Sequence, residues 1–307
     1  MYILQQKTLS EKISFEGVGL HSGKSSKITI LPNDVDKGII FKRVDLESDN
    51  IIKACYKNVS SAKLCTTLQN DHGVKVSTVE HLLAALYIYG VDNALIEINN
   101  EEVPIMDGSA KEFLYSLEKV DLLSQTKKRK YLKILKKEEL IDGTRKIFIE
   151  PKNTFEVDFE LNYENKIIGK QRNLVNFQKD DLDLVTESRT FCLFEDVEKI
   201  KKLGLAKGGS LNNAIVVGED KVLNEAGLRN EKEFVNHKIL DLAGDFLLSG
   251  FRVIGKVTCQ HGGHELTNMF LRKLIEKKSS YKIIELEGDL VLSQTKAFLP
   301  IKEAVNA

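Results

Sequence analysis

The chain has 307 residues, of which 42% are hydrophobic and 29% are charged, so it is long enough to form two domains with their own cores. Lysine plus arginine and aspartate plus glutamate each number 45, and this balance excludes a strong overall charge favouring nucleic acid or an acidic membrane surface. No apolar stretch approaches the roughly 18 residues of a membrane-spanning helix, and the first residues lack the pattern of a signal peptide. We therefore expect a cytoplasmic protein with no stable membrane insertion.

The four cysteines give no sign of a disulfide framework or of a thiolate metal site. Cys55, Cys65, Cys192 and Cys259 are far apart in the sequence and form no CxxC pair. We expect reduced, mostly buried thiols. Any metal ion would therefore be held by histidine and carboxylate.

The first part of the chain predicts strands followed by a helix, a strand and a second helix. Apolar and polar residues alternate over residues 9–41, as they do in strands. A helix from Thr78, a strand over residues 94–98 and a helix over residues 109–119 come next.

The second part repeats this order. Residues 145–153 resemble residues 26–34 at an offset of 146 − 27 = 119, and the helix around His237 repeats the helix around His81 at an offset of 237 − 81 = 156. A strand over residues 252–258 and a helix over residues 265–276 complete the second series. We therefore predict a duplicated α+β unit, with 156 − 119 = 37 extra residues in the second copy.

The boundary between the copies is predicted in the polar, basic run of residues 124–130. A linker explains this run better than a phosphate-binding patch, because charge runs are mostly solvated connections. The predicted domains are residues 1–126 and 127–307.

The segment over residues 234–248 carries the first candidate site. As a helix it places Ile239, Leu242, Ala243 and Phe246 on one apolar stripe. The polar residues of the segment recur every four residues on roughly the opposite side, and they are His237, Asp241 and Asp245. A histidine four residues before an aspartate suits a first-row metal, whereas the alternative is a solvated polar face.

Three further candidates have both structural and chemical interpretations. Glu80 could form a capping box with Ser77, but the adjacent His81 occupies the position in its copy that His237 occupies in the other. Thr190 is a loop threonine or a hydrogen-bond donor, and His264 is a helix cap or a proton donor after a glycine turn. A pseudo-twofold axis would bring the two helical histidines together between the copies, where clefts tend to form.

Taken jointly, two histidines and one aspartate provide three protein ligands and leave a fourth metal position for water. Such an open site is typical of catalytic zinc and not of structural zinc. Glu80 could accept a proton from the water, and His264 could donate one to a leaving group. The combination indicates metal-assisted hydrolysis.

Several long motifs occur in an order that resembles one known family. They are GVGLHSG at residues 17–23, TVEHL at 78–82, PIMDGS at 104–109, SRTF at 188–191, GGS at 208–210, VLNEAGLR at 222–229, HKILD at 237–241 and GH at 263–264. The chain resembles the UDP-3-O-acyl-N-acetylglucosamine deacetylases, zinc amidases at the committed step of lipid A biosynthesis in Gram-negative bacteria. The resemblance implies a duplicated two-layer α+β sandwich, with the site between two similar domains and one small insert in each.

The resemblance also implies that a second insert, at about residues 191–226, forms an apolar passage for the acyl chain of the substrate. The residues that match its lining and the adjacent substrate contacts are Leu20, Phe191, Phe194, Val197, Gly209, Ala214 and Val216. Because burying one CH₂ group is worth about 0.8 kcal/mol, a passage of fixed length can measure chain length.

The roles of the remaining residues also follow from the resemblance. His81, His237 and Asp241 would bind Zn²⁺, although such a site also accepts Fe²⁺ or Co²⁺. The other matched residues are Glu80 as general base, Thr190 as donor to the oxyanion, His264 as acid kept protonated by Asp245, Lys238 as a contact to substrate oxygens or phosphate, and Arg145 and Tyr163 beside the nucleotide.

The implied reaction is hydrolysis of the N-acetyl group of UDP-3-O-[(3R)-3-hydroxyacyl]-N-acetylglucosamine, which gives the free amine and acetate. The alternatives are a deacetylase for another N-acetyl sugar and a metal-stabilised binding module without turnover. In every case the expected partner is a small molecule, with no nucleic acid and no obligate protein partner.

Overall fold

A computed structural model describes residues 3–287 of the chain. Its strands are β1 Gln5–Leu9, β2 Ile13–Val18, β3 Ser25–Pro32, β4 Ile39–Arg43, β5 Ile51–Lys53, β6 Val59–Ser61, β7 Thr67–Gln69, β8 Lys75–Val76, β9 Ala94–Ile98, β10 Leu122–Lys128, β11 Lys130–Ile134, β12 Glu138–Asp142, β13 Arg145–Glu150, β14 Phe155–Asn162, β15 Lys170–Asn176, β16 Phe191–Leu193, β17 Ile215–Val217, β18 Arg252–Gln260 and β19 Tyr281–Glu285. Its helices are the 3₁₀ turn η1 Tyr56–Asn58 and the α-helices α1 Glu80–Tyr89, α2 Lys111–Leu117, α3 Asp183–Thr186, α4 Phe194–Lys202, α5 Glu233–Leu247 and α6 His264–Glu276.

The two main sheets share one topology. The first has the order β2-β3-β9-β4-β5, in which only the β9–β4 pair is parallel. The second contains β12-β13-β18 with β14 and β15 beyond, and there only the β18–β14 pair is parallel within this set. The matching order and directions favour the predicted duplication. The second sheet additionally pairs β18 with β11, and β11 with β19.

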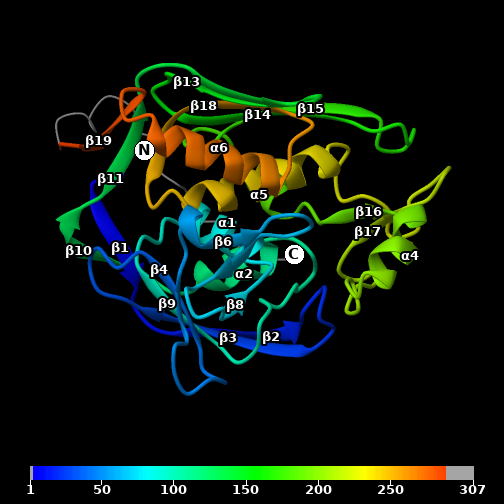
Figure 1. Ribbon diagram of the computed structural model, residues 1–307, viewed down its shortest axis with the longest axis horizontal. Helices are drawn as coiled ribbons and strands as arrows, with labels where there is room; N and C mark the ends of the chain where they lie inside the picture. The colour runs from blue at the N-terminus through cyan, green and yellow to red at the C-terminus, as the bar shows by residue number, and fades with distance from the viewer. Residues whose placement is uncertain (1–2, 288–307) are drawn as a thin grey trace, which may run out of the picture.

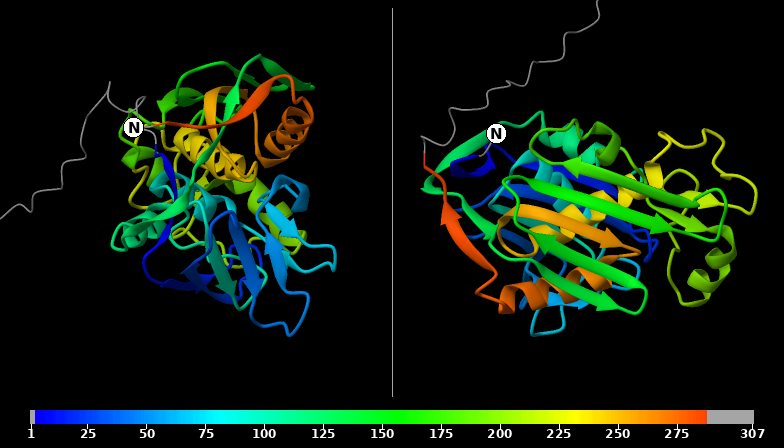
Figure 2. Two further views of the ribbon diagram at one scale, coloured as in Figure 1. Left: turned by 90° about the vertical axis from the view of Figure 1, so that its left-hand side faces the viewer. Right: turned by 90° about the horizontal axis from the view of Figure 1, so that it is seen from above.

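Helices α1, α2, α5 and α6 lie between these two sheets, and α4 lies outside them beside β16 and β17 (Figure 1). Viewed from above, the second sheet covers α5 and α6, and α1 and α2 lie toward the first sheet (Figure 2). α1 packs directly against α5 at the centre of the molecule. The predicted α+β class is confirmed, and the contact between α1 and α5 brings the two halves together.

Each half also carries a small additional unit. In the first half, β6, β7 and β8 form a separate antiparallel sheet between β5 and α1. In the second half, β16 and β17 form a short parallel pair that flanks α4 (Figure 1). The second unit lies within residues 191–226, where the second insert was expected, whereas no position had been predicted for the first.

Two expectations about local structure were wrong, and one helix was predicted correctly but too long. The predicted linker at residues 124–130 is mostly strand, because β10 pairs antiparallel with β1 and thereby joins the start of the chain to the end of the first half. The predicted capping box is absent, since Val79 precedes α1 and the Ser77 hydroxyl donates to the Glu101 carbonyl. The helix expected over residues 109–119 is limited to α2.

The division into residues 1–126 and 127–307 stays a prediction, and residues 288–307 lie outside the described residues. Within residues 3–287, the structure has no helix long and apolar enough to span a membrane.

Candidate metal centre and active site

The crossing of α1 and α5 brings together three potential metal ligands. His81 lies in the first turn of α1, and His237 and Asp241 lie on successive turns of α5. Their ligand atoms all lie within 4.8 Å of one another. The predicted alternative of a solvated helix face is wrong, because the exposed fractions are 4% for His81, 1% for His237 and 4% for Asp241.

A glycine allows the two helices to approach this closely. Gly244 lies on α5 between the turns that carry Asp241 and Asp245. A Cβ atom added to Gly244 would lie 2.1 Å from the Glu80 carbonyl oxygen on α1. The absence of a side chain at this position therefore sets the separation between His81 and the α5 ligands.

The atoms of the three side chains fit a metal ion. The Asp241 Oδ1 atom lies 3.5 Å from His81 Nε2 and 3.3 Å from His237 Nε2. Ligand atoms about 2 Å from a tetrahedral zinc ion lie roughly 3.3 Å apart, which matches these separations. The same Oδ1 atom is buried without a hydrogen-bond partner, although buried carboxylate oxygens are otherwise satisfied.

Neighbouring groups fix the protonation of these ligands. His237 Nδ1 donates to the Ser188 carbonyl at 3.1 Å, so its Nε2 atom carries the free lone pair. Burial lowers the pKa of His237 to about 3, which keeps the imidazole neutral. The pKa of Asp241 lies well below its usual value despite burial, because His237, Lys238 and His264 favour the carboxylate. His237 therefore offers a neutral imidazole and Asp241 a carboxylate.

Glu80 lies beside the ligands with its carboxylate in a buried, low-dielectric environment. Burial raises its pKa, against the opposing effect of His264 and His81. The Thr66 amide donates to Glu80 Oε2 at 3.0 Å, and the Thr66 hydroxyl donates to Asp245 Oδ1 at 2.7 Å. One residue thus holds both carboxylates, and it is a residue that no sequence pattern indicated.

His264 faces Glu80 from the first turn of α6. Its Nδ1 atom donates to Asp245 Oδ2 at 2.8 Å, and its Nε2 atom lies 3.7 Å from Glu80 Oε1 and 3.8 Å from Asp241 Oδ2. Burial opposes the charged form, but the carboxylates of Asp245, Glu80 and Asp241 raise the pKa of His264 to about 10. The site therefore pairs a carboxylate with an imidazolium, which is a combination suited to general acid–base chemistry.

The segment that contains Thr190 runs beside α5. Phe191 follows Thr190, and its ring centre lies 6.3 Å from that of His237. The Lys238 ammonium lies 5.5 Å from the centre of the Phe191 ring and donates to Asp241 Oδ2 at 2.9 Å. The Tyr163 ring lies 5.8 Å from the Phe191 ring. Predicted substrate-contact residues are thus brought next to the ligands.

Arg145 lies farther out and already has acidic partners. It ion-pairs with Asp142 and also donates to Glu265 Oε2 at 3.1 Å. Glu265 follows His264 on α6, so Arg145 lies near the rim of the site. Binding of a phosphate group there would compete with two existing ion pairs.

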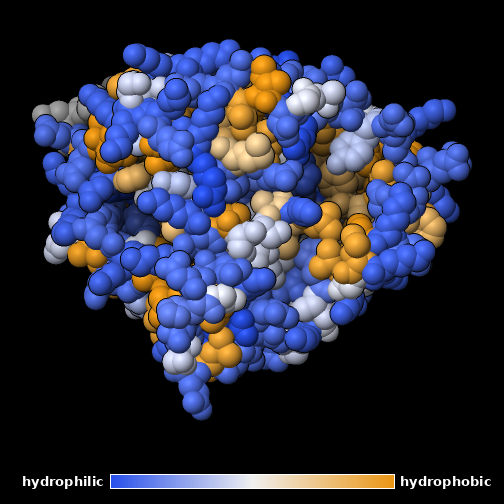
Figure 3. Space-filling view, in the orientation of Figure 1, coloured by the Kyte–Doolittle hydropathy of each residue, from blue (hydrophilic) through white to orange (hydrophobic). Residues whose placement is uncertain are grey.

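The residues predicted to line the passage in the second insert differ in how exposed they are. Ala214 is buried and Val216 is half-buried, whereas Phe194 on α4 is 60% exposed and Val197 is half-buried. A Cβ atom at Gly209 would lie 3.6 Å from the Leu20 side chain, so these two predicted residues are neighbours. Apolar side chains gather between the centre of the molecule and the insert (Figure 3).

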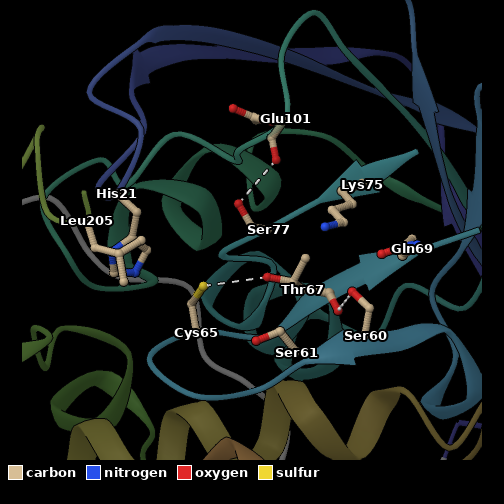
Figure 4. A pocket seen from close by; sticks show the side chains of 10 residues that line it. All are labelled: His21, Ser60, Ser61, Cys65, Thr67, Gln69, Lys75, Ser77, Glu101 and Leu205. Carbon is tan, nitrogen blue, oxygen red and sulfur yellow. Dashed lines mark hydrogen bonds between the residues drawn. The ribbon is translucent and has the colours of Figure 1, made fainter. Parts of the chain in front are cut away.

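A cavity of about 290 Å³ opens at the small sheet of β6, β7 and β8. The lining residues are His21, Ser60, Ser61, Cys65, Thr67, Gln69, Lys75, Ser77, Glu101 and Leu205. His21 and Leu205 lie on one side of it, and Lys75 and Gln69 lie on the other (Figure 4). Cys65 and Thr67 flank Thr66, which connects this wall to the Glu80 and Asp245 carboxylates.

Comparison with known proteins finds related sequences over most of the chain. A family model described as UDP-3-O-acyl N-acetylglycosamine deacetylase matches residues 6–276. A UDP-3-O-acyl-N-acetylglucosamine deacetylase of Pseudoalteromonas translucida is 38% identical over 293 residues, which cover 94% of this chain and 97% of the relative. The enzyme of the same name from Saccharophagus degradans is 41% identical over 292 residues, covering 94% of this chain and 96% of the relative. With a buried His-His-Asp cluster at the crossing of its two central helices, the chain belongs to the UDP-3-O-acyl N-acetylglycosamine deacetylase family.

Proposed function

We propose that this chain hydrolyses the N-acetyl amide of UDP-3-O-[(3R)-3-hydroxyacyl]-N-acetylglucosamine to the free amine and acetate, the committed step of lipid A biosynthesis, with a metal ion held by His81, His237 and Asp241. The observation that carries the metal site is Asp241 Oδ1, a buried carboxylate oxygen without a hydrogen bond that faces two imidazole Nε2 atoms. The deacetylase names of the family and of the relatives supply the reaction class. Zn²⁺ is the proposed ion, and Fe²⁺ or Co²⁺ suit the same ligands.

Glu80 is the proposed general base. The bound ion would supply Lewis-acid polarisation of the amide carbonyl and would lower the pKa of water. Glu80 takes the proton of the attacking water, and its raised pKa brings its basicity closer to that of a group working near neutral pH. The Thr66 amide holds the second carboxylate oxygen, so Oε1 is the atom directed toward the reaction.

His264 is the proposed general acid. With a pKa of about 10 in the metal-free protein, its imidazolium carries the proton that the departing sugar nitrogen needs. Asp245 accepts the hydrogen bond from Nδ1, which leaves the Nε2 proton for transfer. Acid and base therefore sit on opposite sides of a 3.7 Å gap between Nε2 and Glu80 Oε1.

The remaining contacts orient the substrate. Thr190 donates a hydrogen bond to the developing oxyanion, an interaction worth about 3 to 4 kcal/mol where comparable donors have been removed. Lys238 contacts substrate oxygens, and Tyr163 and Arg145 lie toward the uridine diphosphate. The acyl chain runs from Leu20 along the second insert. The cytoplasmic location expected from the sequence stays a prediction.

Acetate release from the acylated UDP-sugar by purified protein tests this function. We expect activity that disappears after chelation and returns when one Zn²⁺ per chain is restored. The same assay with a substrate lacking the 3-O-acyl chain separates the proposal from a general N-acetyl-sugar deacetylase. Metal bound at one ion per chain without acetate release from either substrate would contradict the proposed reaction.

A further inference from the structure

Glu102 is a buried acidic residue outside the metal centre, just before the PIMDGS motif. It is 1% exposed, and its carboxylate accepts three hydrogen bonds. Oε1 accepts from the His21 amide at 2.8 Å and from the Thr78 hydroxyl at 2.9 Å, and Oε2 accepts from the Ser22 amide at 2.7 Å. Within residues 3–287, no lysine or arginine forms an ion pair with Glu102. A buried carboxylate held by neutral donors is costly, so its contacts call for an explanation.

One branch of these contacts holds the loop over residues 19–23, here called the Leu20 loop. The carboxylate packs so closely that a Cβ atom at Gly19 would lie 2.4 Å from Glu102 Oε2. On its other side the Leu20 loop meets the second insert. The Leu20 carbonyl accepts from the Gly208 amide at 3.0 Å, and the His21 carbonyl accepts from the Lys207 amide at 3.3 Å.

The other branch holds the residue that leads into α1. Thr78 has a φ of 56°, a left-handed conformation that β-branched residues rarely adopt. Its hydroxyl donates to Glu102, so the carboxylate helps to hold this turn. Glu80 and His81 follow two and three residues later and begin the helix. The direction in which α1 starts therefore depends on the same carboxylate that holds the Leu20 loop.

We propose that Glu102 is a positioning residue that fixes the Leu20 loop relative to the start of α1. This proposal rests on the proposed function, in which the acyl chain runs past Leu20 and the amide lies beside Glu80 and His81. The carboxylate sets the distance between the chain-binding wall and the reacting groups. It thereby determines which acyl length places the amide correctly, although it touches neither the chain nor the amide.

Two substitutions separate the two branches. Glu102→Gln keeps the size of the side chain but replaces one acceptor oxygen by a donor, so it cannot accept from the loop amides and from Thr78 together. Thr78→Val removes only the hydroxyl contact and leaves both loop contacts in place. Glu97→Gln is the matched control, because Glu97 forms a surface ion pair with Lys42 at 3.6 Å.

The measurement is kcat/KM for substrates of two acyl lengths, the preferred one and one shorter by four carbons. We expect Glu102→Gln to reduce the preference between them at least fivefold. Thr78→Val cuts the link between the carboxylate and the start of α1, so it should also reduce this preference, whereas Glu97→Gln should behave as wild type. Hydrogen exchange of the His21 and Ser22 amides should accelerate at least tenfold in Glu102→Gln only.

An unchanged length preference in an active Glu102→Gln variant, with all rates reduced in proportion, would show a merely structural carboxylate and overturn the proposal. Unchanged amide exchange at His21 and Ser22 would overturn it as well. If wild-type protein releases no acetate from either substrate, the proposed function fails instead, and the exchange data alone then decide whether Glu102 holds the Leu20 loop.

Discussion

Replacing Gly244 with alanine tests whether the close approach of α1 and α5 builds the site. In a solvated helix this change stabilises by about 1 kcal/mol, because glycine is a poor helix former. Here the new Cβ would lie 2.1 Å from the Glu80 carbonyl oxygen, whereas real Cβ contacts stay above 3.0 Å, so the helices must separate by at least 3.0 − 2.1 = 0.9 Å.

That separation has a structural cost and a functional cost. Overpacking of a well-packed core costs about 1–3 kcal/mol, which outweighs the gain in helix propensity. Because the shift moves Glu80 and His81 away from Asp241, we expect weaker zinc binding. A displacement of about 1 Å at a reacting group lowers the rate on the order of 100-fold.

Urea unfolding, zinc competition with a chelator, and acetate release measure the three effects. Gly38→Ala is the control, since Gly38 has a φ of +67° and nothing within 4 Å of its added Cβ. This control should lose stability through backbone strain while zinc affinity and turnover stay normal. A Gly244→Ala protein that gains stability and keeps wild-type zinc affinity would refute the reasoning.

Two further predictions concern charged groups of the site, and a third concerns a buried ion pair between Arg189 and Glu233. The Glu80→Ala variant should retain one zinc ion per chain, as measured by elemental analysis, but its kcat should fall by at least about 100-fold. Near-normal turnover with the metal retained would exclude Glu80 as the base. In metal-free protein the pKa of His264 is raised from 6.5 to about 10, so its contribution to stability is complete below pH 6.5 and lost as the pH rises through about 10. In the Asp245→Asn variant this stability contribution should be lost at a lower pH. NMR titration of the His264 imidazole and unfolding measurements at several pH values test this. The buried Arg189 guanidinium lies 2.8 Å from Glu233 Oε1, and Glu233→Gln leaves it without an anionic partner. We expect the free energy of unfolding, measured in urea, to fall by about 3–5 kcal/mol. Asp196→Asn, which breaks the exposed pair with Lys199, should lower it by less than about 1 kcal/mol.

The core of the site was predictable because helical spacing determines which side chains share a face. The four-residue spacing of His237 and Asp241, and the equivalent placement of His81, predicted their proximity. The two imidazole rings do meet, with ring centres 5.0 Å apart. The strand over residues 94–98 and the α+β class were also correct.

What the sequence could not indicate depends on contacts made through the backbone or between helices. The polar side of α5 is buried because another helix covers it, and hydrophobic periodicity does not distinguish such a side from one that faces solvent. Thr66 reaches Glu80 through its amide, and Ser188 reaches His237 through its carbonyl, so neither contact depends on the type of side chain. Strand β10 was missed because its pairing with β1 is set by tertiary position, while its polar composition is common in linkers.

The two central helices contribute unequally to the site, and the inequality fits the proposed chemistry. At the offset of 156 residues that relates His81 to His237, Asp241 corresponds to Ala85, Asp245 to Tyr89, and Glu80 to Asn236. Each helix thus supplies one imidazole, but only α5 supplies an anionic ligand. A second carboxylate on the ion would reduce its Lewis acidity, so the α1 position four residues after His81 is better occupied by a small apolar residue such as Ala85. The carboxylate that α1 does supply, Glu80, instead faces His264, where it can accept a proton without joining the ligand set.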